Sequence, residues 1–150
     1  FAGIGGTLIE GGHGISVQAD CTVEQMKLAD TDMVLLPGGL GGVHSIMASE
    51  TAMNFIRLAY EKNCLIAAIC AAPTILASLH ITDGRRATCY PGLEDQMDAA
   101  KMIPCGAVQD GNVITGRAAG SADEFGLACL RALKGEDTAR QVAADIVYRA

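Results

Sequence analysis

Apolar residues of this chain gather in short continuous runs, and between the runs they recur with helical spacing. The runs at residues 33–36 and 64–69 contain no charged or strongly polar side chain. Such runs are typical of parallel strands that are buried on both faces. Shorter strands are expected at residues 15–17, 87–90, 107–108 and 113–115, the last two forming a hairpin.

Helical spacing is clearest at residues 49–62, where Met53, Ile56 and Tyr60 share one face and Ser49 is a suitable N-cap. A capping-box pattern at Ser121 opens a helix that extends to about residue 133. Shorter helical segments are expected at residues 22–29 (with Thr22 as N-cap), 72–79, 94–102 and 138–148.

Strands and helices therefore alternate along the chain, with one inserted hairpin. This order predicts an α/β fold with a doubly wound, mostly parallel sheet. We expect residues 1–150 to form a single domain, because no linker, repeat or low-complexity stretch interrupts them. Ligands of such sheets bind beyond the carboxyl ends of the strands. Gly38 and Gly39 follow one strand at this edge, and Cys70 follows another.

The run that ends at Cys70 is followed at once by Ala71, Ala72 and Pro73. A buried strand, a turn of small residues and a helix form the elbow that exposes a nucleophile in serine hydrolases. The dipole of the following helix favours the thiolate form of a cysteine there. The local pattern also fits a small core cysteine, because free cysteines are often buried. The nearby Gly38-Gly39 strand end favours the nucleophile.

Charge and composition exclude several classes of function. The formal net charge of −6 gives nucleic-acid binding no electrostatic support. No apolar run is long enough for a membrane span, and no secretory signal is present. None of the six cysteines forms a C-x-x-C pair, which argues against a metal site. The cysteines are typical of reduced thiols in a cytoplasmic protein.

Four segments carry a resemblance to a known family: residues 34–39, 65–74, 114–117 and 123–128. With them, the chain closely resembles the ThiJ/PfpI superfamily, and in particular its branch of Parkinsonism-associated deglycases ("DJ-one"). The resemblance implies a flavodoxin-like sheet of the class I glutamine-amidotransferase type. It also implies a homodimer that needs no metal and no organic cofactor.

The family pattern begins before Phe1. The resemblance implies a preceding βαβ unit of ~30 residues, the size of a minimal unit of this kind. That unit carries an acidic residue that hydrogen-bonds the nucleophilic cysteine. Glu10 and Glu24 do not take its place, because neither follows a strand as the pattern demands. We therefore expect that an N-terminal segment is missing from residues 1–150, and that it was cleaved or is carried by a separate chain. Either this separate fragment supplies the acid or residues 1–150 alone are catalytically incomplete.

The resemblance also implies roles for individual residues. Cys70 matches the nucleophile, and the backbone N–H groups of Gly39 and Ala71 match the oxyanion site. Tyr90 stands where some members carry a histidine, and residues 118–120 stand where a Gly-Pro-Gly loop is common, so a loosened loop is expected there. The residues expected to line the site are Gly38, Tyr90 and Arg117. Arg117 would bind a carboxylate or phosphate of the substrate, or else cap a helix or form an ion pair at an interface.

The residue after the nucleophile separates two activities. Protease-like members carry a histidine at this position, whereas this chain has Ala71, and no motif links His13, His44 or His80 to Cys70. A PfpI-type cysteine peptidase is therefore disfavoured. We expect a deglycase or glutathione-independent glyoxalase that forms a hemithioacetal between Cys70 and methylglyoxal or its adducts. The alternative is a redox-sensing or chaperone-like protein that uses oxidation of Cys70.

The remaining cysteines and two glycines receive structural roles. Cys64 and Cys129 lie in apolar periodic segments and are expected in the core. Three further cysteines lie near the ends of elements, where accessibility is expected: Cys21, Cys89 and Cys105. The two glycines, Gly41 and Gly42, are expected to shape the loop that follows Pro37-Gly38-Gly39.

Overall fold

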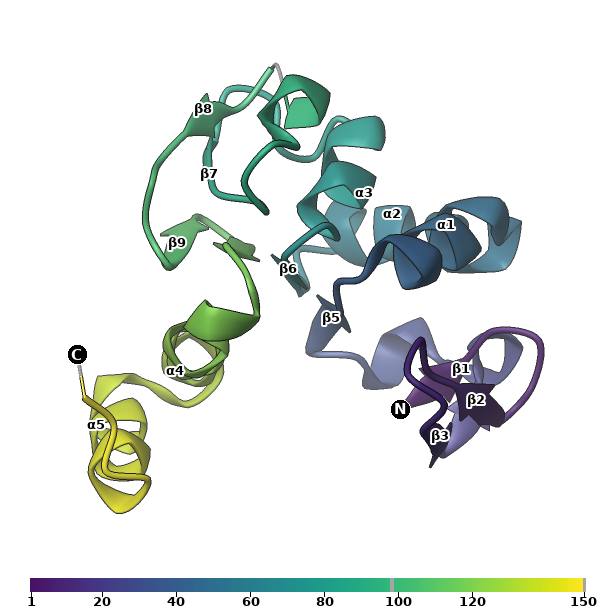
Figure 1. The fold of residues 1–150 in the computed structure, drawn as a ribbon, viewed down its shortest axis with the longest axis horizontal. Helices are drawn as coiled ribbons and strands as arrows, with labels where there is room; N and C mark the ends of the chain where they lie inside the picture. Colours follow the sequence, from purple (N-terminus) through teal and green to yellow (C-terminus); the bar gives the residue numbers. More distant parts are fainter. Residues whose placement is uncertain (98, 150) are drawn as a thin grey trace.

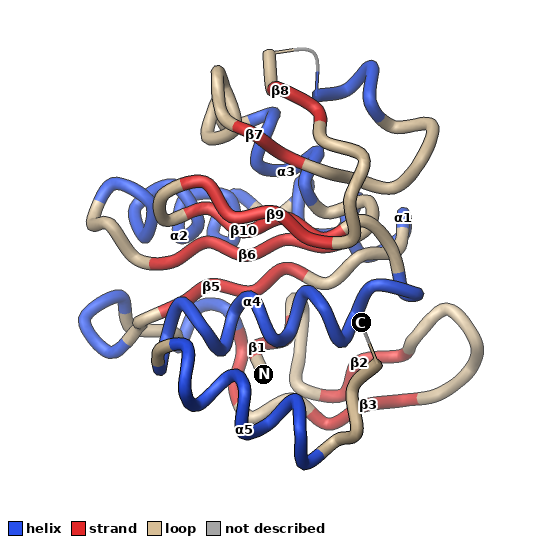
Figure 2. Tube along the Cα trace, turned by 90° about the vertical axis from the view of Figure 1, so that its left-hand side faces the viewer, coloured by secondary structure: helices blue, strands red, loops and turns tan. Residues whose placement is uncertain are grey.

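The computed structural model describes residues 1–97 and 99–149. Its centre is a four-stranded sheet in the order β5–β6–β10–β9 (Figure 2). Three of the strands run parallel, and β9 pairs with β10 as an antiparallel hairpin. This arrangement confirms the predicted α/β sheet and its inserted hairpin. The strands are β5 (Met33–Leu36), β6 (Leu65–Ile69), β9 (Ala107–Asp110) and β10 (Val113–Gly116).

Helices cover both faces of this sheet (Figures 1 and 2). One face carries α1 (Leu40–Ala48), α2 (Glu50–Glu61) and α3 (Pro73–Ser78). The opposite face carries α4 (Ala122–Lys134), and α5 (Glu136–Asp145) packs against α4. Two covered faces explain why the central strand β6 is apolar without alternation.

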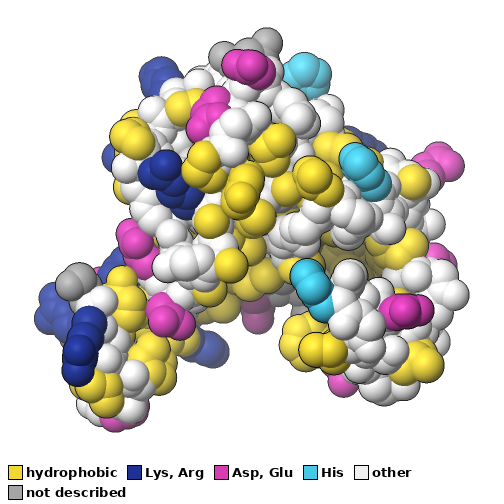
Figure 3. Space-filling model, in the orientation of Figure 1, with side chains coloured by type: hydrophobic (Ala, Val, Ile, Leu, Met, Phe, Trp, Pro, Cys, Tyr) yellow, Lys and Arg dark blue, Asp and Glu magenta, His cyan; other side chains and the backbone are white. Residues whose placement is uncertain are grey.

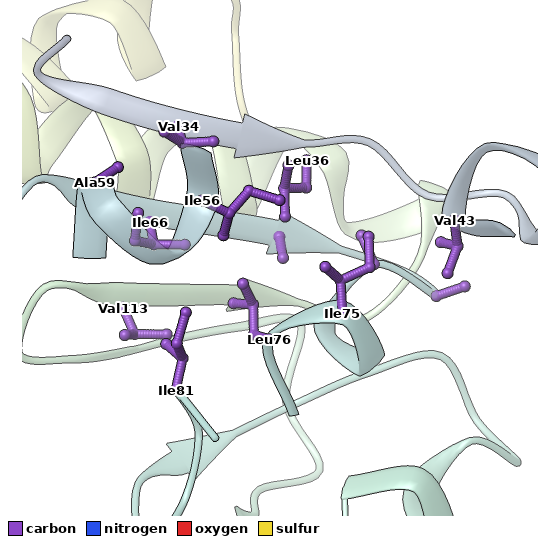
Figure 4. Packing of buried hydrophobic residues seen from close by; sticks show 13 residues of the cluster. Val34, Leu36, Val43, Ile56, Ala59, Ile66, Ile75, Leu76, Ile81 and Val113 are labelled. Carbon is purple, nitrogen blue, oxygen red and sulfur yellow. The ribbon is translucent and has the colours of Figure 1, made fainter. Parts of the chain in front are cut away.

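The core forms where helices α1 to α3 meet the sheet (Figure 4). Ile66 of β6 and Val113 of β10 are paired in register and pack in the same cluster as Ile56 of α2. Ala67, the next residue of β6, faces the opposite cluster with Phe125 of α4. Alternate residues of one strand thus contribute to two separate cores.

The N-terminal segment forms two short sheets beside the central one. Strand β1 (Ala2–Gly3) pairs in parallel with β4 (Cys21–Thr22), and β2 (Leu8–Glu10) forms a hairpin with β3 (Ser16–Gln18). The strand expected at residues 15–17 is confirmed with its bounds shifted by one residue.

The helix expected at residues 22–29 is wrong. The segment forms two 3-10 turns, η1 (Val23–Gln25) and η2 (Leu28–Asp30), separated by extended backbone at Met26. Val23 is buried and Leu28 packs against the main core. In an α-helix these two positions would lie about 140° apart around the axis. The extended break lets both side chains reach the interior.

The loop expected at residues 41–42 is also wrong, because both glycines lie within α1. Gly39, with φ 89°, is the N-cap, and its carbonyl accepts a hydrogen bond of 3.0 Å from the Val43 N–H. Val43 is buried, and Ile46 packs against the same cluster. Tertiary packing of this face therefore overrides the low helix propensity of glycine.

The segment before the hairpin is more irregular than expected. Strand β7 (Arg86–Ala87) pairs in parallel with β8 (Lys101–Met102), so the strand expected at 87–90 is shorter. The helical segment expected at 94–102 is limited to the 3-10 turn η3 (Glu94–Met97), and Asp98 lies outside the described residues. The last helix begins at residue 136 instead of 138.

Candidate functional site

Cys70 occupies a strained turn between β6 and α3. Its φ of 66° lies in the left-handed region, which costs a residue with a Cβ about 1–2 kcal/mol. Two flanking segments hold this conformation. The Cys70 N–H donates to the Gly116 carbonyl at 2.9 Å, and the Cys70 carbonyl accepts from the Tyr90 N–H at 2.8 Å. The backbone of the predicted elbow is therefore fixed from both sides.

The end of β5 lies directly against this turn. A Cβ added to Gly38 would stand 2.4 Å from the Cys70 Cβ and 2.9 Å from the Ile69 carbonyl oxygen. Both distances are far below van der Waals contact, so a side chain at this position would displace the elbow. The structure thus brings together the two strand ends that the sequence analysis singled out.

Two backbone N–H groups beside Cys70 have no acceptor among the described residues. One belongs to Ala71, which is buried and follows the nucleophile. The other belongs to Gly39, the residue that precedes α1. Unpaired N–H groups at such positions can bind an oxyanion that develops on a substrate. They are the two groups predicted for this role.

Tyr90 and Arg117 flank the elbow on neighbouring segments. The Tyr90 side chain is half-exposed, and its backbone is tied to Cys70 as described. Arg117 follows β10 directly and is half-buried, and its N–H donates to the Gly106 carbonyl at 2.8 Å. The loosened loop expected after it is instead the short 3-10 turn η4 (Ala119–Ser121).

No carboxylate among residues 1–97 and 99–149 forms a hydrogen bond with the Cys70 thiol. Glu10 lies in the β2–β3 hairpin and Glu24 in the turn η1, both exposed. A hydrogen bond with Thr22 lowers the pKa of the Glu24 carboxyl. An acidic partner of Cys70 outside these residues stays a prediction.

The other cysteines differ from Cys70 in their surroundings. Burial raises the pKa of the Cys89 and Cys129 thiols to about 11, which keeps them protonated near neutral pH. Burial also raises the pKa of Cys105. The accessibility expected for Cys89 is wrong, because its side chain packs with Ala87 and Met97 under η3 and is only 2% exposed. The core position expected for Cys129 is confirmed.

The three histidines lie on the surface. His13, His44 and His80 are exposed, and His80 pairs with Asp83 at 3.1 Å. In the part of the chain that the structure describes, none of them forms a hydrogen bond with Cys70. The same part contains no group of three or more His, Cys, Asp or Glu side chains that could hold a metal ion. None of its helices combines the length and apolarity needed to cross a bilayer.

An apolar cleft of about 480 Å³ lies along the free edge of β5, away from Cys70. It separates this edge from the N-terminal segment and opens as a hollow in the surface (Figure 3). Its walls include Phe1 and Met26 on one side, and Leu35 and Phe55 on the other. Leu35 is half-exposed, although it belongs to the central sheet.

Comparison with known proteins gives the family of the chain. A family model described as the DJ-1/PfpI family matches residues 1–132, a range that includes the elbow and Arg117. The chain belongs to the DJ-1/PfpI family. The dj-1beta protein of Drosophila melanogaster is 34% identical over 141 residues, which cover 93% of this chain and 75% of the fly protein. A protein of Pyrococcus horikoshii named Deglycase PH1704 is 33% identical, over 73% of this chain and 66% of that protein.

Solved DJ-1/PfpI structures share the fold over nearly the whole chain. The crystal structure of Drosophila DJ-1beta aligns with a TM-score of 0.92 at 33% identity, covering 99% of this chain and 82% of the fly chain. The oxidized DJ-1 of Toxoplasma gondii aligns with a TM-score of 0.88 at 25% identity, covering 97% and 80%. The flavodoxin-like sheet implied by the resemblance is therefore confirmed.

Sequence reasoning missed two groups that position this DJ-1/PfpI site. One is the Gly116 carbonyl, which accepts from the Cys70 N–H, and the other is Thr115, whose Oγ1 accepts from the Thr88 N–H at 2.9 Å. The hairpin strand at 113–115 was expected, but its parallel pairing with the strand that ends at Cys70 was not. Only the parallel pairing of β10 with β6 places these groups beside the elbow.

Proposed function

We propose that the protein uses Cys70 as a nucleophile toward α-oxoaldehydes such as methylglyoxal, or toward their early adducts. The observation that carries this proposal is the elbow, where a half-buried cysteine at positive φ stands beside the N–H groups of Gly39 and Ala71, which are unpaired among the described residues. The Pyrococcus relative named as a deglycase supports the same chemistry. Ala71 in place of a histidine disfavours a peptidase.

The proposed reaction is redox-neutral within the substrate. The Cys70 thiolate adds to the aldehyde carbon of methylglyoxal, and the N–H groups of Gly39 and Ala71 stabilise the oxyanion that forms. A carboxylate moves the proton from this carbon to the neighbouring one, which converts the hemithioacetal to a thioester. Water then cleaves the thioester, releasing lactate and regenerating the thiol. The sum is methylglyoxal plus water giving lactate, without a cofactor.

The test is lactate formation from methylglyoxal by the full protein. Cys70→Ser is expected to reduce the rate by roughly a thousandfold or more, because loss of a nucleophile removes the covalent route. Cys21→Ser is the matched control, because Cys21 belongs to β4, outside the central sheet that carries Cys70. Equal rates for wild type and Cys70→Ser would refute the proposal. A nonzero wild-type rate must be established first with glutathione absent.

A second candidate function is redox sensing by Cys70. It is favoured by the contrast between Cys70, which is only half-buried, and the buried thiols of Cys89 and Cys129, whose pKa is raised. The oxidized structure of the Toxoplasma relative is consistent with this function. Mass spectrometry after mild peroxide treatment should find Cys70 oxidised before Cys129. Equal rates at the two residues would exclude the sensor.

The partners follow from the same proposal. We infer a small aldehyde or glycated substrate and a homodimer. Native mass spectrometry of the purified protein is expected to show two copies of the chain in one complex, and a monomer alone would contradict the dimer.

A further inference from the structure

Arg117 stands beside Cys70 at the carboxyl edge of the sheet. Strands β10 and β6 are parallel, and their last paired residues are Gly116 and Ile69. The next residue on each strand is therefore Arg117 on one side and Cys70 on the other. The hydrogen bond from the Cys70 N–H to the Gly116 carbonyl holds the two segments together at this point.

Strand alternation gives the side of the sheet on which the Arg117 side chain lies. A Cβ on Gly116 would meet Ile69 and Phe125, on the α4 side. Thr115 faces the opposite side, where it binds the Thr88 N–H. Arg117 continues this alternation.

The segment that carries Tyr90 closes the same edge of the sheet, because the Tyr90 N–H donates to the Cys70 carbonyl. The backbone of Arg117 therefore stands next to the backbone of Cys70 at the end of two paired strands.

Arg117 has no carboxylate partner among the described residues, unlike most arginines of the chain. Five others form ion pairs with Asp or Glu: Arg57, Arg85, Arg86, Arg131 and Arg140. Arg117 is half-buried, and its backbone is fixed by the hydrogen bond to Gly106. A guanidinium that is positioned but unpaired is suited to bidentate binding of a planar carboxylate.

We propose that Arg117 binds a carboxylate group on molecules that approach Cys70, and that it holds the hydroxy-acid product of the reaction. This inference rests on the proposed function for the identity of the product. The anion subsite itself does not depend on turnover, because it follows from the position of Arg117.

The experiment compares two alkylating reagents that differ only in this group. Iodoacetate carries a carboxylate and iodoacetamide an uncharged amide of the same shape, and both alkylate a cysteine thiolate with loss of iodide. The readout is the rate of Cys70 alkylation by each reagent, followed by mass spectrometry of the full protein. The ratio of the two rates, divided by the ratio for free cysteine, measures the preference for the carboxylate.

Arg117→Gln is expected to lower this normalised ratio by about tenfold, the effect of losing a charge-assisted hydrogen bond. Arg117→Lys should be intermediate, because it keeps the charge and loses the planar fork. A change in the reactivity of the Cys70 thiolate alters both rates together and cancels in the ratio. Arg140→Gln, on the surface of α5, is the control and should match wild type.

The iodoacetamide rate also reports whether the elbow is intact in each variant. If Arg117→Gln keeps the wild-type ratio, the proposal is overturned. If the ratio falls but no lactate forms in any variant, the anion subsite stands and the proposed glyoxalase reaction fails. A ratio for wild type equal to that of free cysteine also overturns the subsite.

Discussion

The chemistry of the candidate site depends on single residues whose backbone geometry admits few substitutes. Cys70 adopts a positive φ with a Cβ, and Gly38 is the residue that makes room for it. The neighbouring Gly42 has a different role: it lies in α1, and a Cβ there would meet no atom within 4 Å. Two glycines four positions apart are thus expected to respond to alanine in opposite directions.

Gly38→Ala is expected to lower the free energy of unfolding by about 1–3 kcal/mol, because the added Cβ overlaps Cys70 and the Ile69 carbonyl. It should also slow alkylation of Cys70. Gly42→Ala is expected to raise the free energy of unfolding by roughly 0.4–1 kcal/mol by restricting the unfolded chain. Urea denaturation of both variants checks the pair, and a stabilised Gly38→Ala variant contradicts the described contact.

At the scale of the elements, helices α2 and α4 both begin after a serine, but only one of the two serines caps its helix. Ser49 caps α2 as predicted, because its Oγ accepts from the Ala52 N–H at 3.2 Å. The capping box predicted at Ser121 is wrong, since its side chain makes no cap hydrogen bond. Glu124 accepts instead from the Ala107 N–H at 3.2 Å and packs against Gly106. A long-range bond to β9 has replaced the local one.

Ser49→Ala is therefore expected to destabilise the protein by about 1 kcal/mol, the usual effect of losing an N-cap. Ser121→Ala should change stability by less than about 0.5 kcal/mol, as surface substitutions usually do. Thermal or urea unfolding of the two variants gives the comparison. Equal destabilisation by both would mean that Ser121 does cap α4 in solution.

At the scale of the whole molecule, the two buried thiols link stability to alkaline pH. The pKa of Cys89 and of Cys129 is raised from 9.0 to about 11 because burial disfavours the thiolate. The unfolded chain loses these protons at lower pH than the folded chain does. The resulting stability is fully present below pH 9 and is lost as pH rises toward 11.

Cys129→Ala is expected to flatten the fall in the free energy of unfolding over this pH range, even if the lost side chain lowers stability at pH 8. Cys21→Ala should leave the pH dependence as in wild type. The measurement is urea unfolding under reducing conditions at about one-unit steps between pH 8 and pH 11. Parallel curves for wild type and Cys129→Ala would contradict the burial described for this thiol.

The sequence by itself determined the features that depend on neighbours along the chain. The continuous runs at 33–36 and 64–69, the amphipathic helix after Ser49 and the turn of small residues after Cys70 are local patterns, and all three appear in the structure. These patterns were sufficient to predict the class of the sheet and the candidate nucleophile. Strand burial and helix periodicity can be predicted from residues that are close together in the sequence.

Only the tertiary structure decided what lies against these features. Packing of Val43 made a helix out of a glycine-rich segment, and the pairing of β10 with β6 placed Gly116 and Arg117 beside Cys70. Burial under η3 turned Cys89 from an expected surface thiol into a core residue. These outcomes depend on contacts between residues far apart in the chain, whose energies exceed the local propensities that a sequence pattern reports.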